Sequence, residues 1–272
     1  MFPFLAKRVD LAGTAVVLVC VSGACEPKLV VGKVVVKEEC VVPGEPDGGA
    51  GASSELLEIP VPWSTGFETG FCDFAQFGYC YERAGASHVV VSEPVHEGRS
   101  AAEFTVTSSL AEPQARCVLR GTMPRDAVYG AWYYVPALAR NNANWNLFHF
   151  RSGAPGALPA DMHGIWDVSL GNGPDGSLHL YVLGLDGVFR NPDPAPPIPI
   201  GAWFQIQFRL KRAADATGAI ALYQDGELLV DEVPAATDDG EFGEWYVGNL
   251  ATGLTPRAST IYVDDVSITA TP

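Results

Sequence analysis

The sequence predicts an all-β protein, a two-sheet antiparallel β-sandwich of the jelly-roll type. First, segments in which apolar and polar residues alternate recur from about residue 100 to the C-terminus, and a period of two is that of a strand with one buried face. Second, the 29 glycines and 21 prolines are typical of many strands joined by turns. Third, we find no convincing amphipathic helix of ten or more residues.

The expected strands follow one another along the chain with few interruptions. They cover residues 102–108, 115–121, 130–136, 145–151, 177–184, 203–212, 220–232 and 259–269. The alternation is cleanest in "WFQIQFRLKR" (203–212), where four apolar side chains share one face. The segment "IALYQDGELLVDE" (220–232) is expected to be a hairpin, because Asp225-Gly226 favours a two-residue turn.

The strand in "WNLFHFRSG" has two faces of different character. Phe148 and Phe150 are expected on one face, and Leu147, His149 and Arg151 on the other. An imidazole and a guanidinium opposite two phenylalanines indicate either an ordinary half-solvated strand or the floor of a binding groove.

Composition limits the possible partners. The chain has 272 residues, enough for one large β domain or two small ones, and 47% of them are hydrophobic. Its 17 basic and 32 acidic residues give a formal charge of −15. Such a surface repels phosphates, so we expect no nucleic-acid partner, and an anionic ligand would need a local arginine cluster. Alternatively, the acidity serves solubility alone.

Residues 1–25 are expected to be an export signal. Two basic residues near the start precede an uncharged run from Leu11 to Cys25, which is shorter than the roughly 20 residues of a membrane-spanning helix. The run ends in Ser-Gly-Ala-Cys, which resembles a bacterial lipoprotein signal and implies lipidation of Cys25, although Ser22 stands where such signals usually have leucine. Ordinary cleavage to a soluble secreted product is the alternative.

Residues 26–60 are expected to be a tether, because "GEPDGGAGASSE" has the composition of a flexible linker. A single folded domain is then expected over residues 61–272. The protein would be either a cell-envelope lipoprotein or a secreted protein, in contact with a membrane only through its lipid.

The six cysteines are consistent with an oxidising compartment. We expect Cys72 and Cys80 to form a disulfide that closes a small loop. Cys117 is expected to be a buried free thiol, and Cys40 to pair with Cys25 if that residue is not lipidated. No Cys-x-x-Cys pair or His/Cys cluster supports a zinc site.

Three stretches resemble a known family. "STGFETGF" (64–71) and "YVDDVSI" (262–268) resemble the paired first and last strands of jelly rolls, and 201–229 resembles a Trp-then-hairpin segment of the lectin-like fold. Residues 63–272 are therefore similar to the concanavalin A-like jelly rolls, in the branch that holds alginate, glucuronan and heparin lyases. These stretches are specific to the fold and only weakly specific to an activity.

The resemblance also implies a site on the concave sheet. Alginate-lyase-type jelly rolls typically carry Arg-x-Glu-Leu-Arg on one strand and Gln-x-His on another. Here "RCVLR" retains Arg116 and Arg120 but has Val118 at the glutamate position, and "HFR" supplies His149 and Arg151. We expect strands 115–121 and 145–151 to lie side by side, so that these side chains meet over one hollow.

A uronate lyase must neutralise a carboxylate, remove the neighbouring proton and protonate the leaving oxygen. Arginine suits the first task, and histidine or tyrosine suits the other two. The resemblance implies that Arg116, Arg120 and Arg151 bind carboxylate, with His149 as base and Tyr181 as acid.

The departures from the lyase pattern favour recognition over cleavage. Our first interpretation is therefore an exported protein that binds a polysaccharide on its concave sheet, with Trp145 stacking on a sugar ring. Cleavage of an acidic polysaccharide by β-elimination is the alternative, and a structural or adhesive envelope domain is the second alternative. For Trp145, packing in the core is the competing interpretation.

A glycoside hydrolase is disfavoured, because it needs two closely spaced carboxylates on one strand face. Residues 102–212 contain no such pattern, and the acidic segment 231–244 is expected to be a loop.

The resemblance further implies a structural calcium site between the first and last strands. Glu68 in "FETG" would supply one carboxylate, and Asp264 or Asp265 in "YVDD" another, since calcium prefers such hard oxygen ligands. Alternatively, one aspartate faces water and the other caps a turn or pairs with an arginine.

Overall fold

The computed structural model describes residues 7–9, 15–21, 24–28, 40, 57–107, 111–155, 157, 161–184, 186–238 and 240–271. They belong to two units, Met1–Glu39 and Cys40–Pro272. In the first unit, β1 (Lys7–Val9), β2 (Ala15–Val21) and β3 (Ala24–Lys28) form an antiparallel sheet. The export signal and the tether stay predictions, because much of both segments and the side chain of Cys25 lie outside the described residues. No described helix is long and apolar enough to span a bilayer.

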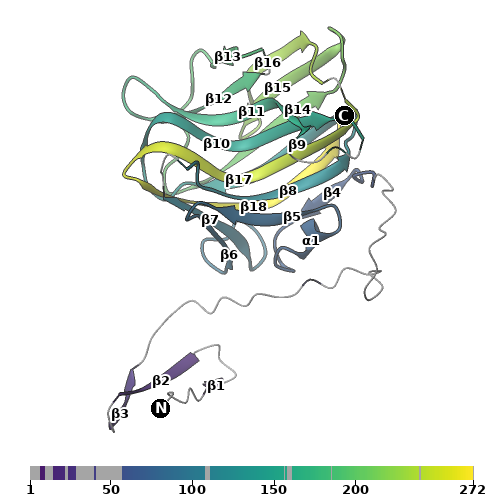
Figure 1. Cartoon of the computed structure of the whole chain (residues 1–272). Coiled ribbons are helices and arrows are strands. Elements are labelled where there is room, and N and C mark those ends of the chain that lie inside the picture. The colour runs from purple at the N-terminus through teal and green to yellow at the C-terminus, as the bar shows by residue number, and fades with distance from the viewer. Residues whose placement is uncertain are drawn as a thin grey trace. The chain divides into compact units, whose positions relative to one another are not determined.

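The second unit is a sandwich of two antiparallel sheets, which confirms the predicted fold class (Figure 1). The seven-stranded sheet has, in spatial order, β13 (Phe189–Arg190), β12 (Leu178–Gly184), β11 (His163–Asn172), β10 (Arg140–Gly153), β17 (Phe242–Thr255), β8 (Gln114–Thr122) and β5 (Gly78–Arg83). The eight-stranded sheet has β16 (Glu227–Ala235), β15 (Gly218–Gln224), β14 (Trp203–Lys211), β9 (Asp126–Tyr134), β18 (Ala258–Ala270), β7 (Ala101–Thr107) and β6 (Ser87–Val91), with β4 (Trp63–Thr65) paired to β18.

Two predicted pairings are confirmed. The first strand of the domain, β4, pairs with the last, β18, with Thr65 opposite Val266. Asp225 and Gly226 form the turn between β15 and β16 with positive φ angles of 52° and 79°, the backbone conformation that this dipeptide favours in a two-residue hairpin turn.

The core lies between the sheets and includes the inward-facing phenylalanines of β10. A β-bulge interrupts the pairing of β10 between Asn146 and Phe148. Because of this bulge Leu147 joins the core, as Phe148 does, and it is Asn146 that lies on the polar face with His149. The expectation that Leu147 shares a face with His149 was wrong, since strict alternation does not continue through a bulge.

The disulfides correct the predicted pairing. Cys80 bonds to Cys117, which lies directly opposite it on the adjacent strand β8, so Cys117 is not a free thiol. Cys72, in the short helix α1 (Cys72–Ala75), bonds to Cys40 instead of Cys80, and Cys40 is therefore not available to Cys25. Closeness in sequence suggested a Cys72–Cys80 bridge, but β-pairing places Cys80 against another strand.

The compact unit begins before residue 61. The carbonyl of Leu57 accepts a hydrogen bond from the N–H of Thr122 at 2.9 Å, and the N–H of Ile59 donates to the carbonyl of Thr122 at 3.0 Å. The Cys40–Cys72 bond also ties the preceding segment to the domain.

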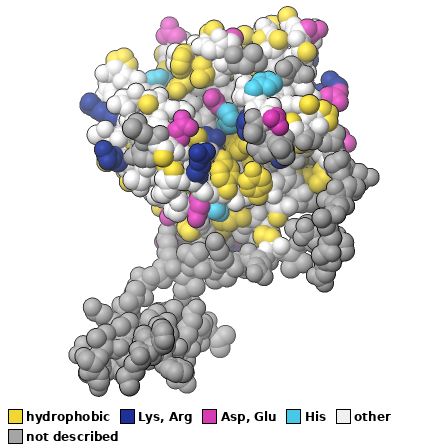
Figure 2. All heavy atoms as spheres, in the orientation of Figure 1, with side chains coloured by type: hydrophobic (Ala, Val, Ile, Leu, Met, Phe, Trp, Pro, Cys, Tyr) yellow, Lys and Arg dark blue, Asp and Glu magenta, His cyan; other side chains and the backbone are white. Residues whose placement is uncertain are grey.

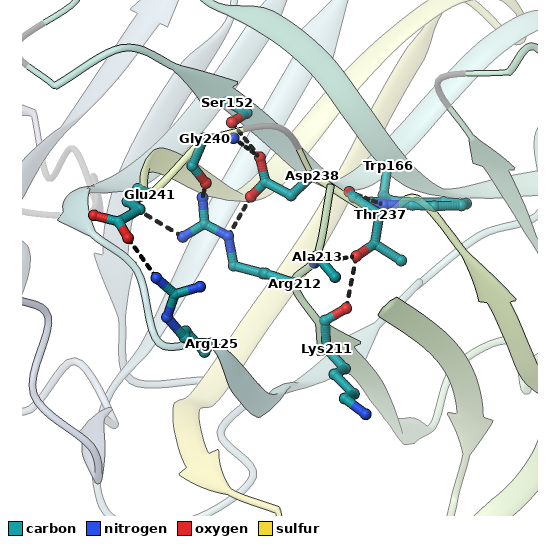
Figure 3. A network of polar contacts seen from close by, with 10 residues as sticks. All are labelled: Arg125, Ser152, Trp166, Lys211, Arg212, Ala213, Thr237, Asp238, Gly240 and Glu241. Atoms are coloured by element: carbon teal, nitrogen blue, oxygen red, sulfur yellow. Dashed lines mark hydrogen bonds and ion pairs between the residues drawn. The ribbon is translucent and has the colours of Figure 1, made fainter. Parts of the chain in front are cut away.

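The connection from β16 to β17 is held by a buried ion pair between Arg212 and Asp238 (Figure 3). The other carboxylate oxygen of Asp238 accepts hydrogen bonds from Ser152, at the end of β10, and from the N–H of Gly240. Arg212 also donates to the carbonyl of Gly240 at 2.6 Å and to that of Glu241 at 3.0 Å. This network, which we call the Arg212–Asp238 clasp, fixes the chain where it crosses between the sheets and enters β17.

Candidate functional site

A polar cavity of about 230 Å³ opens on the outer face of the seven-stranded sheet. Its lining comes from five adjacent strands and includes Tyr81, Arg116, Asn146, His149, Asp167 and Tyr246. Figure 2 shows histidine, basic and acidic side chains gathered beside hydrophobic ones in the middle of this face. Arg151 also lines the cavity, so three of the residues predicted for the site meet there: Arg116, His149 and Arg151.

The predicted strands share this cavity although they are not neighbours. β17 lies between β8 and β10, so the expectation that 115–121 and 145–151 lie side by side was wrong. Gly248 of β17 is opposite Arg116, whose guanidinium reaches across to Asn146 on β10, where Nη2 donates to Oδ1. A Cβ at Gly248 would lie 2.5 Å from the carbonyl oxygen of Ala115, so the close approach of β17 to the backbone of β8 requires glycine here.

His149 is held in one orientation by a carboxylate. Its Nδ1 lies 2.5 Å from Oδ1 of Asp167, which is opposite it on β11. The same oxygen of Asp167 accepts a hydrogen bond of 2.9 Å from Nδ2 of Asn146. Among the described residues Nε2 of His149 has no hydrogen-bonding partner. An imidazole fixed through Nδ1 with a free Nε2 is suited to accept a proton.

Tyr246 lies beside His149, on the neighbouring strand β17. The two residues are opposite each other on β17 and β10, and their ring centroids are 5.4 Å apart. The Tyr246 hydroxyl donates a hydrogen bond to Glu244. Burial raises the pKa of Tyr246 well above its ordinary value, and the hydrogen bond to the Glu244 carboxylate raises it further. The hydroxyl therefore stays protonated at neutral pH.

Two of the predicted arginines flank a buried carboxylate. Oε1 of Glu244 lies 3.6 Å from Nε of Arg120, and its Oε2 lies 3.4 Å from Nη1 of Arg151. Arg120 also donates to the carbonyl of Ala157 and is not part of the cavity lining. Its guanidinium therefore supports Glu244, whereas the resemblance implied contact with substrate.

Glu244 and Tyr246 escaped the sequence analysis, because the acidic segment ending at Glu244 was expected to be a loop. Instead β17 begins at Phe242, and its alternation places Glu244, Tyr246 and Gly248 on the outer face and Trp245 in the core. That period of two was visible in "FGEWYVGN" and could have identified the strand.

Arg116 is the most buried cation of the cavity. Only 3% of its surface is exposed, and burial lowers its pKa from the ordinary value for arginine. The cavity lining has two arginines, Arg116 and Arg151, and one carboxylate, Asp167. The site is therefore locally cationic on a chain whose formal charge is −15, which favours an anionic ligand.

Two further predicted residues lie elsewhere. Trp145 is fully buried and donates from Nε1 to Oδ1 of Asn249 at 3.1 Å, so it packs in the core and cannot stack on a sugar. Tyr181 is on β12, outside the cavity lining, with its ring 5.7 Å from that of Phe189. Because β11 separates β10 from β12, the tyrosine beside His149 is Tyr246.

The residues predicted to bind calcium contact N–H donors of one loop. Asp264 accepts a hydrogen bond of 2.9 Å from the backbone N–H of His96, and Asp265 lies 2.6 Å from the His96 ring nitrogen Nδ1. Glu68 accepts the backbone N–H of Arg99 at 2.6 Å. The described residues contain no cluster of three or more metal-ligating side chains, and a cation here would have to displace these donors. Asp264 thus caps a loop, as the alternative expected of one aspartate, whereas Asp265 contacts the His96 ring; calcium stays a prediction.

Asp264 should make stability depend on pH. Burial raises its pKa to about 6, so the folded state binds this proton more tightly than the unfolded state does. Its contribution to the free energy of unfolding is present at low pH and is lost as the pH rises through about 6. Denaturant unfolding at about pH 4 and pH 7, with Asp264→Asn as the comparison, should show a smaller pH dependence in the variant.

If calcium binds between the first and last strands, a chelator lowers Tm near pH 7. A melt unchanged by chelator contradicts the calcium site.

No family model matches the sequence, and no curated protein matches it. Among solved structures, the endo-β-1,4-glucuronan lyase from the fungus Trichoderma reesei superposes with a TM-score of 0.58 and 18% identity, covering 76% of this chain and 94% of that one. The cellulose induced protein Cip1 gives a TM-score of 0.54 and 16% identity over 76% and 97% of the two chains. A variant of the alginate lyase Aly36B in complex with alginate trisaccharide gives a TM-score of 0.51 and 12% identity, covering 79% of this chain and 100% of that one. The predicted likeness to jelly-roll polysaccharide lyases is confirmed, and it concerns the fold.

Proposed function

We propose that this protein is a polysaccharide lyase that cleaves an acidic, uronate-containing polysaccharide by β-elimination in the cavity of the seven-stranded sheet. The observation that carries the proposal is His149, oriented by Asp167 and facing Tyr246 in a cationic cavity. The fold shared with glucuronan and alginate lyases supports it as well. Cleavage, the alternative in our sequence analysis, thus replaces recognition alone as the preferred function.

Each part of the reaction has a group to perform it. Arg116, oriented by its hydrogen bond to Asn146, binds the sugar carboxylate, which makes the hydrogen on the adjacent ring carbon more acidic. Nε2 of His149 accepts that proton as the C–H bond breaks. The electron pair forms a carbon–carbon double bond and expels the glycosidic oxygen on the neighbouring carbon. Tyr246, held protonated beside Glu244, donates its proton to that oxygen, and solvent returns both groups to their starting states.

The direct test is the absorbance of the unsaturated uronate product. The wild-type protein should raise this absorbance with one or more of polyglucuronate, alginate and heparin, and should leave a neutral glucan unchanged. No rise with any of the acidic polymers would contradict the proposal.

Recognition without cleavage is the second candidate, favoured by two departures. Val118 stands where the lyase pattern has glutamate, and Arg120 and Arg151 are already flanked by Glu244. Binding of an acidic polymer by affinity electrophoresis, with no product absorbance, would support this candidate. A structural envelope role fits less well, since it gives no reason for a cavity lined by oriented polar groups.

We further propose export, which the Cys40–Cys72 and Cys80–Cys117 disulfides support, because such bonds are typical of exported proteins. A lipid on Cys25 would move the full chain into the detergent phase on Triton X-114 partition, and Cys25→Ser would return it to the aqueous phase.

A further inference from the structure

One row of side chains crosses the whole outer face of the seven-stranded sheet. Strand register places its members directly opposite one another, one on each strand from β5 to β13: Tyr79, Val118, Tyr246, His149, Asp167, Leu183 and Phe189. Residues paired in this way project from the same face of a sheet. The proposed reacting pair, His149 and Tyr246, therefore lies in the middle of a continuous line.

Both ends of the row are exposed aromatic side chains. Tyr79 is 44% exposed and Phe189 is 59% exposed, whereas Tyr246 near the centre is buried. Tyr79 lies beside Tyr81, with ring centroids 5.7 Å apart, and Phe189 lies beside Tyr181 at the same separation. Each end thus presents a pair of aromatic rings.

The neighbours of Phe189 confirm which face it occupies. The next residue, Arg190, places its guanidinium 5.0 Å from the ring of Trp166, a core residue. Since successive strand residues point to opposite faces, Phe189 projects to the outer face with Tyr181.

The size of the row matches an extended polymer. Seven strands give six spacings of about 4.8 Å, so the row is roughly 29 Å long. A single exposed apolar residue needs no explanation, but here an aromatic pair stands at each end of a row that runs through the cavity. Flat apolar rings can pack against the faces of sugar rings.

We propose that Tyr79 and Phe189 are the two end subsites of a polysaccharide groove that runs perpendicular to the strands, each stacking on a sugar ring of one chain. The chain lies across the sheet with sugar units bound on both sides of the cavity, so the protein acts on internal positions of long chains. This inference rests on the proposed function of the cavity and adds the path and length of its substrate.

The test compares long and short substrates. Phe189→Ala and Tyr79→Ala should each raise KM for the long polymer about tenfold, with kcat nearly unchanged. Neither should alter turnover of oligosaccharides too short to reach beyond the cavity. Phe189→Trp, which keeps an aromatic ring, should have the wild-type KM. Val188→Ala, at an exposed neighbour in the chain, should leave KM unchanged. Tm of each variant should equal that of the wild type.

An unchanged KM for the long polymer in both alanine variants would overturn the inference, and so would an equal loss on long and short substrates. Affinity for the same polymers, measured in a His149→Ala background, separates the subsites from the chemistry. If the wild type cleaves the polymer and the Tyr79→Ala and Phe189→Ala variants have the same KM as the wild type, only the subsites are wrong. If the wild type neither cleaves nor binds any acidic polymer, the proposed function fails and the subsites with it.

Discussion

Replacing His149 with alanine should lower kcat by about 100-fold or more on whichever acidic polymer the wild type cleaves. The physical reason is that the proposed mechanism makes Nε2 the proton acceptor, with Nδ1 engaged by Asp167 at 2.5 Å. KM should change little, because Arg116, to which we assign the carboxylate, remains in place with its hydrogen bond to Asn146. The measurement is the initial rate of product absorbance across a range of polymer concentrations.

A matched histidine controls for effects unrelated to the chemistry. His179 is on β12 in the same sheet and outside the cavity lining, so His179→Ala should retain wild-type kcat. The kcat of Asp167→Asn should lie between those of His149→Ala and His179→Ala, because this change weakens the orientation of the imidazole but leaves the imidazole in place. Wild-type turnover in His149→Ala, with an unchanged Tm, would show that this residue is not the base.

Replacing Asp238 with alanine should lower the free energy of unfolding by about 3–5 kcal/mol. The side chains of Arg212 and Asp238 are only 5% and 1% exposed, so the variant leaves a guanidinium buried without its counter-charge. It also removes the acceptor for Ser152 and for the N–H of Gly240. Denaturant unfolding followed by tryptophan fluorescence measures the change, which should appear in the midpoint with the slope unchanged.

The neighbouring exposed ion pair provides the control for the clasp. Arg125 pairs with Glu241 next to the Arg212–Asp238 clasp, but both side chains are largely exposed. Arg125→Ala should therefore cost at most about 1 kcal/mol, because solvent screens such pairs. Equal midpoints for Asp238→Ala and Arg125→Ala would contradict a stabilising role for the clasp.

The clasp also bears on the site. It joins Ser152, next to Arg151 in β10, to the segment that leads into β17, and Glu244 follows directly. Loosening this connection should disturb the Arg151–Glu244 contact, and through it the hydroxyl of Tyr246. Activity of Asp238→Ala should fall even at temperatures where the variant is folded.

Local pattern in the sequence was enough to determine the fold class and the face of most residues. A period of two identified the strands, and Asp225-Gly226 located a hairpin. The same pattern placed His149 and Arg151 on a polar face, where the cavity lies. These features depend on residues that are close together in the chain, so they can be read from the sequence directly.

Only the tertiary structure decided which strands are adjacent. The insertion of β17 between β8 and β10 brings Tyr246 to His149 in place of Tyr181, and buries Glu244 between two arginines. Another non-local pairing, that of β5 with β8, sets Cys80 against Cys117. Alternation specifies which side of a strand a residue occupies. It does not specify which distant strand completes the sheet, because that choice depends on the packing and connections of the whole chain.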